Sequence, residues 1–99
     1  MLIIAGTITL DPAQIDDAVA LAIPFCELVR EEPGCVEYLF TPNPANPGEL
    51  RLFEIWETEE DLAVHFTTPH MAEWQQQIGQ FSITGRDIVK YDVSGSAPL

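Results

Sequence analysis

The chain has 99 residues, of which 46% are hydrophobic, which suits one globular domain with a modest core. Sixteen acidic residues against four basic ones give a net charge of −12 at pH 7, which argues against nucleic acid or an anionic membrane surface as a partner. No apolar run is long enough for a membrane-spanning helix and the first residues lack a basic signal-peptide region, so we expect a cytoplasmic protein whose single domain spans residues 1–99.

Residues 2–10 predict a strand, because isoleucine and threonine dominate this stretch. Both faces of the strand are uncharged, so we expect both to be covered. Gly6 leaves a gap in the layer of side chains. It predicts either a bulge or space for a bound ligand.

A helix is predicted from Asp11 to about Glu31, with Asp11 as the cap and Pro12 in the first turn. An apolar stripe at spacings of three and four supports it: Ile15, Ala18, Val19, Ala22, Cys26 and Val29. Pro33 and Gly34 end the helix. We expect Cys26 in the helix core and Cys35 in a strand to be reduced thiols rather than a disulfide pair, since no export signal is present.

The second strand is predicted over residues 35–41, with Val36, Tyr38 and Phe40 on one face, and a proline-rich loop follows at 43–48. The third strand, 49–57, places Glu54 and Trp56 on a common face. A carboxylate in an apolar layer is costly unless it is paired. Glu54 is therefore expected at the sheet rim, bonded to Tyr38 or Arg51, or in a functional role.

Two short helices follow, with Thr58 as the cap of the first, and Thr68 with Pro69 as the start of the second. A fourth strand is predicted over residues 86–93, and residues 94–99 form a polar tail that we expect to be flexible. The resulting order, βαββαβ, predicts a ferredoxin-like α+β fold. Its helices can cover only one face of the sheet, so a second copy of the chain is the simplest cover for the other face.

Three segments together resemble the antibiotic-biosynthesis monooxygenase family, and its quinol monooxygenase branch in particular. They are Glu54-Ile-Trp-Glu-Thr58, His65-Phe-Thr-Thr-Pro-His-Met71, and Glu32-Pro-Gly-Cys35 followed by Tyr38. The resemblance implies a homodimeric α+β barrel. It also implies a cofactor-independent monooxygenase that oxidises a quinol-like or polyphenolic aromatic with O2.

Seven residues are the candidates for such a site. His65 would be the general base, because an imidazole titrates near neutral pH and can take a phenol proton. Trp56 would be a stacking wall, and Tyr38 and Glu54 would orient the substrate. The remaining candidates for substrate contacts are His70, Phe66 and Gly6. No cofactor or metal is expected, since no nucleotide-binding loop or ligand cluster is present.

Other interpretations remain open at this stage. Each candidate could simply pack in the core of a non-enzymatic binding or stress-response dimer. An isomerase of a small carbonyl compound on the same fold would share the Thr-Pro-His stretch, and would need a small polar pocket containing both histidines. A haem-degrading relative would have an asparagine on the first strand and a later histidine, where this chain has Gly6 or Thr7 and Gln75.

Overall fold

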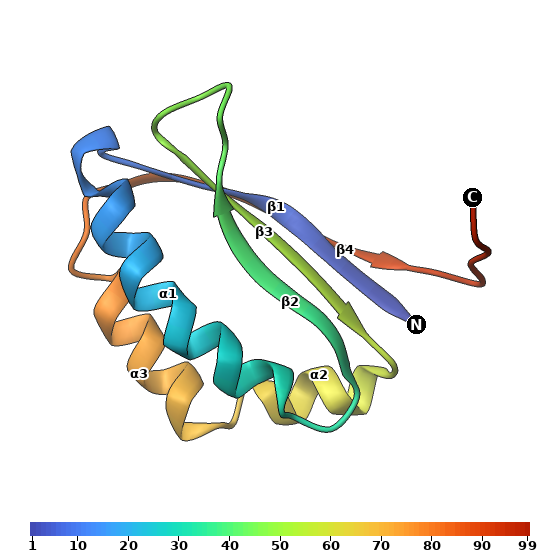
Figure 1. Cartoon of the computed structure of the whole chain (residues 1–99). Coiled ribbons are helices and arrows are strands. Elements are labelled where there is room, and N and C mark those ends of the chain that lie inside the picture. The colour runs from blue at the N-terminus through green and yellow to red at the C-terminus, as the bar shows by residue number, and fades with distance from the viewer.

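The computed structural model describes residues 1–99 and has a four-stranded antiparallel sheet with the order β2-β3-β1-β4 (Figure 1). Its elements are β1 (Leu2–Leu10), a 3-10 turn (Pro12–Gln14), α1 (Ile15–Arg30), β2 (Cys35–Pro42), β3 (Glu49–Trp56), α2 (Glu59–His65), α3 (Pro69–Ile78) and β4 (Ile83–Asp92). This arrangement confirms the predicted ferredoxin-like α+β fold. Both cysteines are free thiols.

Alternation along the two central strands builds the core. On β1 the residues that face the helices are buried, namely Leu2, Ile4, Ile8 and Leu10. On β3 they are Leu50, Leu52, Glu54 and Trp56. Because β1 and β3 pair in antiparallel register, Leu2 lies opposite Trp56 and Ile4 lies opposite Glu54. The register places an acid in the buried layer.

The predicted helix caps are present. Asp11 accepts a hydrogen bond from the backbone of Ala13, Thr58 from that of Asp61 and Thr68 from that of Met71. These bonds satisfy backbone donors that the first turn leaves free. The cap at Thr68 fixes the break between α2 and α3, which separates His65 from His70.

Two details of the sheet differ from the sequence prediction. Val36 does not share a face with Tyr38, because the β2–β3 register shifts between Cys35 and Glu37 and leaves Val36 exposed in a bulge. Gly6 is not at a bulge. It pairs regularly with β4, and a β-carbon there would collide with the backbone of Asp87 and Ile88, so the close approach of β4 requires glycine.

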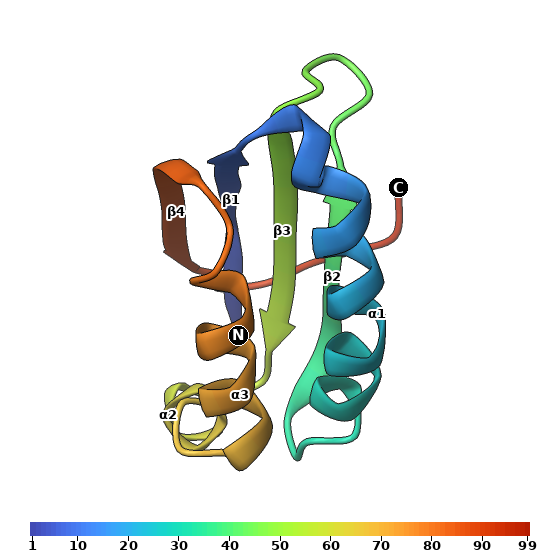
Figure 2. The ribbon, with the colours of Figure 1, turned by 90° about the vertical axis from the view of Figure 1, so that its left-hand side faces the viewer.

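The helices lie on one face of the sheet only, as Figure 2 shows. The opposite face carries partly exposed apolar side chains, including Ile3, Phe53, Ile55, Val89 and Tyr91. Residues 94–99 form no helix or strand, and they run on the open side of the sheet (Figure 2). No helix has the length and apolar character needed to cross a membrane.

Candidate functional site

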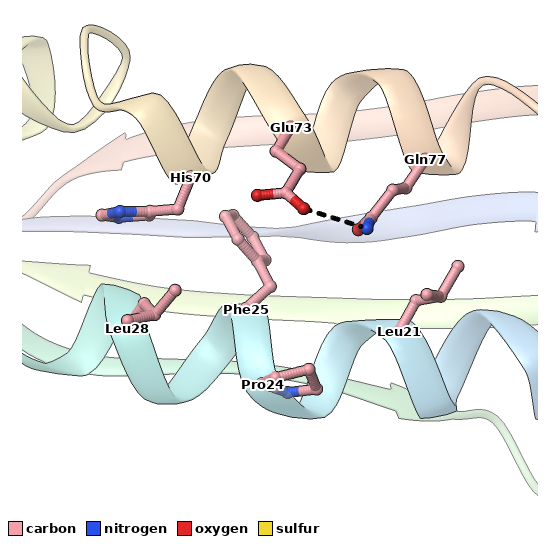
Figure 3. A pocket seen from close by; sticks show the side chains of 7 residues that line it. All are labelled: Leu21, Pro24, Phe25, Leu28, His70, Glu73 and Gln77. Atoms are coloured by element: carbon pink, nitrogen blue, oxygen red, sulfur yellow. Dashed lines mark hydrogen bonds between the residues drawn. The ribbon is translucent and has the colours of Figure 1, made fainter.

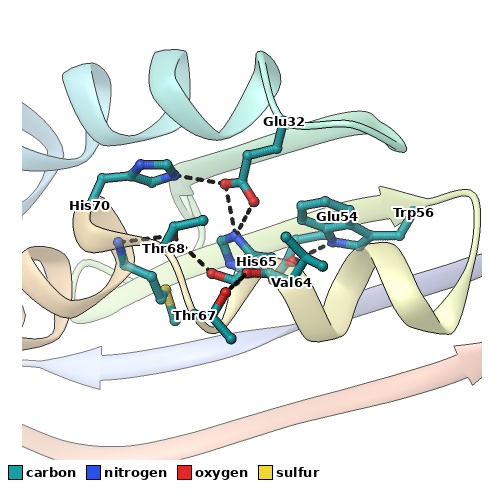
Figure 4. Close-up of polar contacts among 9 residues, drawn as sticks. Glu32, Glu54, Trp56, Val64, His65, Thr67, Thr68 and His70 are labelled. Atoms are coloured by element: carbon teal, nitrogen blue, oxygen red, sulfur yellow. Dashed lines mark hydrogen bonds and ion pairs between the residues drawn. The ribbon is translucent and has the colours of Figure 1, made fainter.

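Glu32 lies in the turn after α1 and joins three separate segments of the chain (Figure 4). Its Oε2 lies 3.0 Å from His65 Nδ1 and 2.7 Å from His70 Nε2. Its side chain is only 8% exposed. A carboxylate accepts hydrogen bonds, so Glu32 can receive one from each of these ring nitrogens that carries a proton. Glu32 therefore fixes the orientation of the two imidazoles.

His65 is the last residue of α2 and is 1% exposed. Its ring is packed between aromatic side chains, with centroid distances of 4.9 Å to Trp56, 5.4 Å to Tyr38 and 5.4 Å to Phe66. Nδ1 is engaged by Glu32, whereas Nε2 has no hydrogen-bond partner within the chain. No fully buried side-chain nitrogen lacks a partner, so Nε2 must reach open space. That space is a cavity which His65 lines.

The cavity has a volume of about 230 Å3 and lies between α2, α3 and the sheet. Its walls are mainly apolar, and its lining residues are Ile4, Ile8, Tyr38, Phe40, Leu52, Glu54, His65, Phe66, Met71, Trp74, Gln75, Ile78, Arg86 and Ile88. A cavity with apolar walls and a few convergent polar groups is typical of a small-molecule site. Its dimensions suit a single aromatic ring with a short substituent.

Glu54 is the buried acid of this cavity, with 5% exposure. It accepts a hydrogen bond of 2.8 Å from Trp56 Nε1, two residues along the same strand. Burial raises the pKa of Glu54 to about 7, although the bond from Trp56 opposes the shift. The predicted partners were wrong, because Arg51 bonds to Thr7 on the open side and Glu54 makes no bond to Tyr38.

Tyr38 lies across the strand pair from Glu54 and is 2% exposed. Burial, and secondarily the neighbouring Glu54 charge, raises the pKa of Tyr38 well above its ordinary value. The phenol therefore stays protonated across physiological pH. Its hydroxyl has no partner in the chain, so it is free to donate a hydrogen bond to a ligand oxygen in the cavity.

His70 lies outside the cavity. It lines a separate groove of about 120 Å3 between α1 and α3, together with Leu21, Pro24, Phe25, Leu28, Glu73 and Gln77 (Figure 3). Phe25 lines the groove and Trp74 lines the cavity, and the two rings stack with their centroids 4.9 Å apart. His70 thus contacts Glu32 but does not line the cavity.

Four of the candidate residues line one cavity, namely Tyr38, Glu54, His65 and Phe66. The remaining candidates lie elsewhere. Trp56 is fully buried against His65 and does not line the cavity, whose aromatic lining also includes Phe40 and Trp74. Gly6 and His70 are also outside the lining.

Sequence reasoning missed Glu32 as a site residue. The sequence offers one signal, the motif Glu32-Pro-Gly-Cys35. By itself this motif indicates the end of a helix and carries part of the family resemblance. Glu32 is more than thirty positions from either histidine, at separations of 33 and 38 residues. No local pattern spans such a separation.

Comparison with known proteins places this geometry in a family. The sequence profile described as antibiotic biosynthesis monooxygenase matches residues 1–77. An uncharacterised Synechocystis protein, sll1783, is 28% identical over 98 residues, which cover 99% of this chain and 67% of that protein. The Bacillus subtilis protein YjcS, also uncharacterised, is 35% identical over 51 residues, covering 52% of this chain and 49% of that protein.

Solved structures share the fold across the whole chain. A proposed antibiotic biosynthesis monooxygenase from Deinococcus radiodurans has a TM-score of 0.89 at 20% identity, covering 100% of this chain and 98% of its own. Rv0793 from Mycobacterium tuberculosis has a TM-score of 0.83 at 24% identity, covering 98% and 97%. At these identities the structures establish the fold, and the profile over residues 1–77 establishes the family. The chain belongs to the antibiotic biosynthesis monooxygenase family.

Proposed function

We propose that the protein is a cofactor-independent monooxygenase that oxidises a quinol-like or polyphenolic aromatic with O2. The observation that carries the proposal is the state of His65. When Nδ1 donates to Glu32, Nε2 is left without a partner in the chain, and His65 lines an apolar cavity. An imidazole held in this tautomer can accept a proton from a bound phenol. The family membership supports the same class of reaction.

In the proposed mechanism the substrate is the electron donor and the protein moves the proton. His65 Nε2 takes the phenolic proton, and the resulting electron-rich anion reacts with O2. For a hydroquinone, one O2 gives a hydroxylated quinone and one water, so the substrate supplies all the electrons that reduce O2. The imidazolium that forms is stabilised by the Glu32 carboxylate.

Two further side chains have roles in positioning the substrate. Tyr38 donates a hydrogen bond to a substrate oxygen, since its hydroxyl is protonated and has no other partner. Glu54, whose pKa of about 7 leaves it partly protonated at neutral pH, can either donate to or accept from a second oxygen. Phe40 and Trp74 supply aromatic walls for the ring.

The same proposal includes a homodimer in which two open sheet faces pack together. Ile3, Phe53, Ile55 and Tyr91 lie on that face, and no helix of this chain covers them. Burying such a surface contributes about 25 cal/mol per Å2. The family membership favours the same assembly.

The character of the cavity favours this function over two of the other interpretations of the sequence, the isomerase and the protein whose candidates only pack in the core. An isomerase of a small carbonyl compound would need a polar pocket containing both histidines, yet only His65 lines the cavity and the walls are mainly apolar. A protein whose candidates serve only for packing would leave no such space. The binding volume of about 230 Å3 therefore supports an aromatic substrate.

The decisive test is O2 uptake by purified, chelator-treated protein with a panel of hydroquinones. We expect uptake without added flavin, haem or metal, with one O2 consumed per hydroxylated quinone formed. Hydrogen peroxide as the main product would mean an oxidase and would contradict the proposal. So would an absence of uptake above the non-enzymatic rate across the whole panel.

A further inference from the structure

Arg86 is unusual among the basic residues of this strongly acidic chain because it has no partner. The chain has four basic side chains. The other three each make a polar contact: Arg30 with the Tyr38 carbonyl at 3.0 Å, Arg51 with Thr7 at 3.1 Å, and Lys90 with Glu59 at 2.9 Å. Arg86 makes no hydrogen bond or ion pair, although acids outnumber bases by sixteen to four. Its guanidinium is therefore available to a ligand.

Arg86 is exposed to solvent and also borders the cavity. It pairs with Ile8 on β1, on the side of the sheet that faces the helices, and it lines the cavity. Gln75 on α3 also lines the cavity and likewise makes no hydrogen bond through its side chain. Two polar groups without partners thus border the same space.

Arg86 lies at the opposite end of the cavity from His65, which packs against Trp56 opposite Leu2. Glu54 pairs with Ile4, whereas Arg86 pairs with Ile8. Four residues along a strand correspond to about 13 Å. The side chains of Glu54 and Arg86 occupy part of that distance. Between them the cavity is lined by apolar residues of the sheet, including Leu52 and Ile88. The remaining length suits one ring with a short substituent.

The charge of the site indicates what the substituent is. Arg86 is the only cation that lines the cavity. A planar guanidinium binds a carboxylate through two parallel hydrogen bonds, and an amide such as Gln75 can add a third donor. The net charge of −12 repels anions at long range, so an anionic group needs a local cation in order to bind here.

We propose that Arg86 and Gln75 bind the carboxylate of a phenolic acid, whose ring hydroxyl lies at the His65 end of the cavity. The substrate class is then a hydroxylated aromatic ring with a carboxylate on the ring or on a short side chain. This inference rests on the proposed function for the direction in which the ring lies. The anion site itself stands on Arg86 and Gln75.

The test compares an acid with its own neutral ester. Binding of 2,5-dihydroxyphenylacetate and of its methyl ester is measured by calorimetry without O2, so that no turnover occurs. A hydrogen bond to a charged group contributes about 1.5–3 kcal/mol, so the acid should bind roughly 10- to 150-fold more tightly than the ester. Arg86→Gln should abolish this preference and leave ester binding within a few fold.

Lys90→Gln is the matched control, because it removes the same charge from the same strand but its side chain pairs with Glu59 outside the cavity. It should retain the preference for the acid. Circular dichroism checks the fold of both variants. Equal affinities of the acid and the ester for the wild type would overturn the proposal. Equal losses in the two variants would overturn it too, since the effect would then be one of net charge.

O2 uptake separates this inference from the proposed function. Binding of the acid through Arg86 with no O2 uptake would keep the anion site and contradict the monooxygenase. If the protein turns over hydroquinones but binds the acid and its ester equally, the monooxygenase is supported and the anion site is contradicted. Rapid uptake that favours the acid in the wild type, and loses this preference in Arg86→Gln, supports both.

Discussion

The two faces of the sheet contrast in what covers them and in what they contain. The helix-covered face holds the core, the cavity and buried ionisable groups, among them Glu54, His65 and Tyr38. The open face holds apolar side chains such as Ile55 and Phe53 with no covering element. Period-two alternation supplies apolar residues to both faces of the sheet. However, α1 and α3 form a single layer, which covers one face alone.

The contrast fits the proposed function, in which the open face serves association and the covered face serves chemistry. Polar groups within an apolar layer are costly and need partners, so their presence on the covered face points to a function there. On the open face the polar groups of the central strands are exposed or paired, as Arg51 is with Thr7, and the apolar side chains there gain most from being buried. Changes on the open face should alter association, whereas changes on the covered face should alter turnover or its pH dependence.

The largest expected effect is on association, through Ile55→Glu on the open face. Each dimer would lose two buried isoleucines, worth about 1.5–3 kcal/mol apiece, so association should weaken by about 3–6 kcal/mol. Sedimentation should then show a dimer for the wild type and a monomer for the variant at micromolar concentration. Ile23→Glu, the same change at a helix position that is 56% exposed, is the control and should remain dimeric. A monomeric wild type would refute the open-face dimer.

On the covered face, His65→Ala should reduce kcat by about 100- to 10,000-fold, which corresponds to about 3–5.5 kcal/mol of transition-state stabilisation. The wild-type rate should also fall at acidic pH, because a protonated imidazole cannot accept a proton, and the variant should lose this acid limb. Steady-state O2 uptake measures both effects. Val64→Ala, one position earlier and 55% exposed, should be nearly neutral. Retention of a third of the activity in His65→Ala would exclude His65 as the base.

Glu54→Gln tests how burial acts on the covered face. The pKa of Glu54 rises from 4.5 to about 7 in the folded protein, so between these values the folded state binds a proton that the unfolded state has released. Stability should therefore fall as pH rises from about 4.5 to 7, by about 3 kcal/mol at most, and then level off. Glu54→Gln should remove this loss, as urea unfolding at pH 5 and pH 8 would show.

The control for that experiment is Glu57→Gln, which changes an exposed carboxylate just beyond the same strand. Its stability should follow the wild-type curve. A Glu54→Gln variant that loses stability between pH 5 and pH 8 as strongly as the wild type would show that Glu54 does not cause the loss.

The smallest effect on kcat is expected from changes at Glu32 and at His70, which test the two hydrogen bonds between Glu32 and the histidines. Glu32→Gln leaves a donor amide or a neutral oxygen against His65 Nδ1, and an impaired hydrogen bond to a buried group costs about 1–3 kcal/mol. We expect kcat to fall about 5- to 150-fold. His70→Gln keeps a donor near Glu32 and lies outside the cavity, so its kcat should stay within a few fold. Equal losses in both variants would mean that His70 takes part in catalysis.

Local sequence was enough to determine the elements and their order. Alternating apolar residues in β1 and β3, the caps at Asp11, Thr58 and Thr68, and the break before Pro69 depend on neighbours within a few positions. Register within β3 also placed Glu54 and Trp56 on the same side. The fourth strand was predicted least accurately, because β4 begins at Ile83 rather than at residue 86.

Only the tertiary structure decided which of these residues meet. Glu32 bonds to histidines 33 and 38 positions away, Arg86 and His65 border one cavity from opposite ends, and Trp56 is covered by His65. Whether a side chain lines a cavity depends on the volumes of neighbours on other elements. Periodicity gives the face on which a residue lies, but not the depth to which α2 and α3 cover it. For that reason the sequence identified His65 as a candidate and the fold supplied its carboxylate.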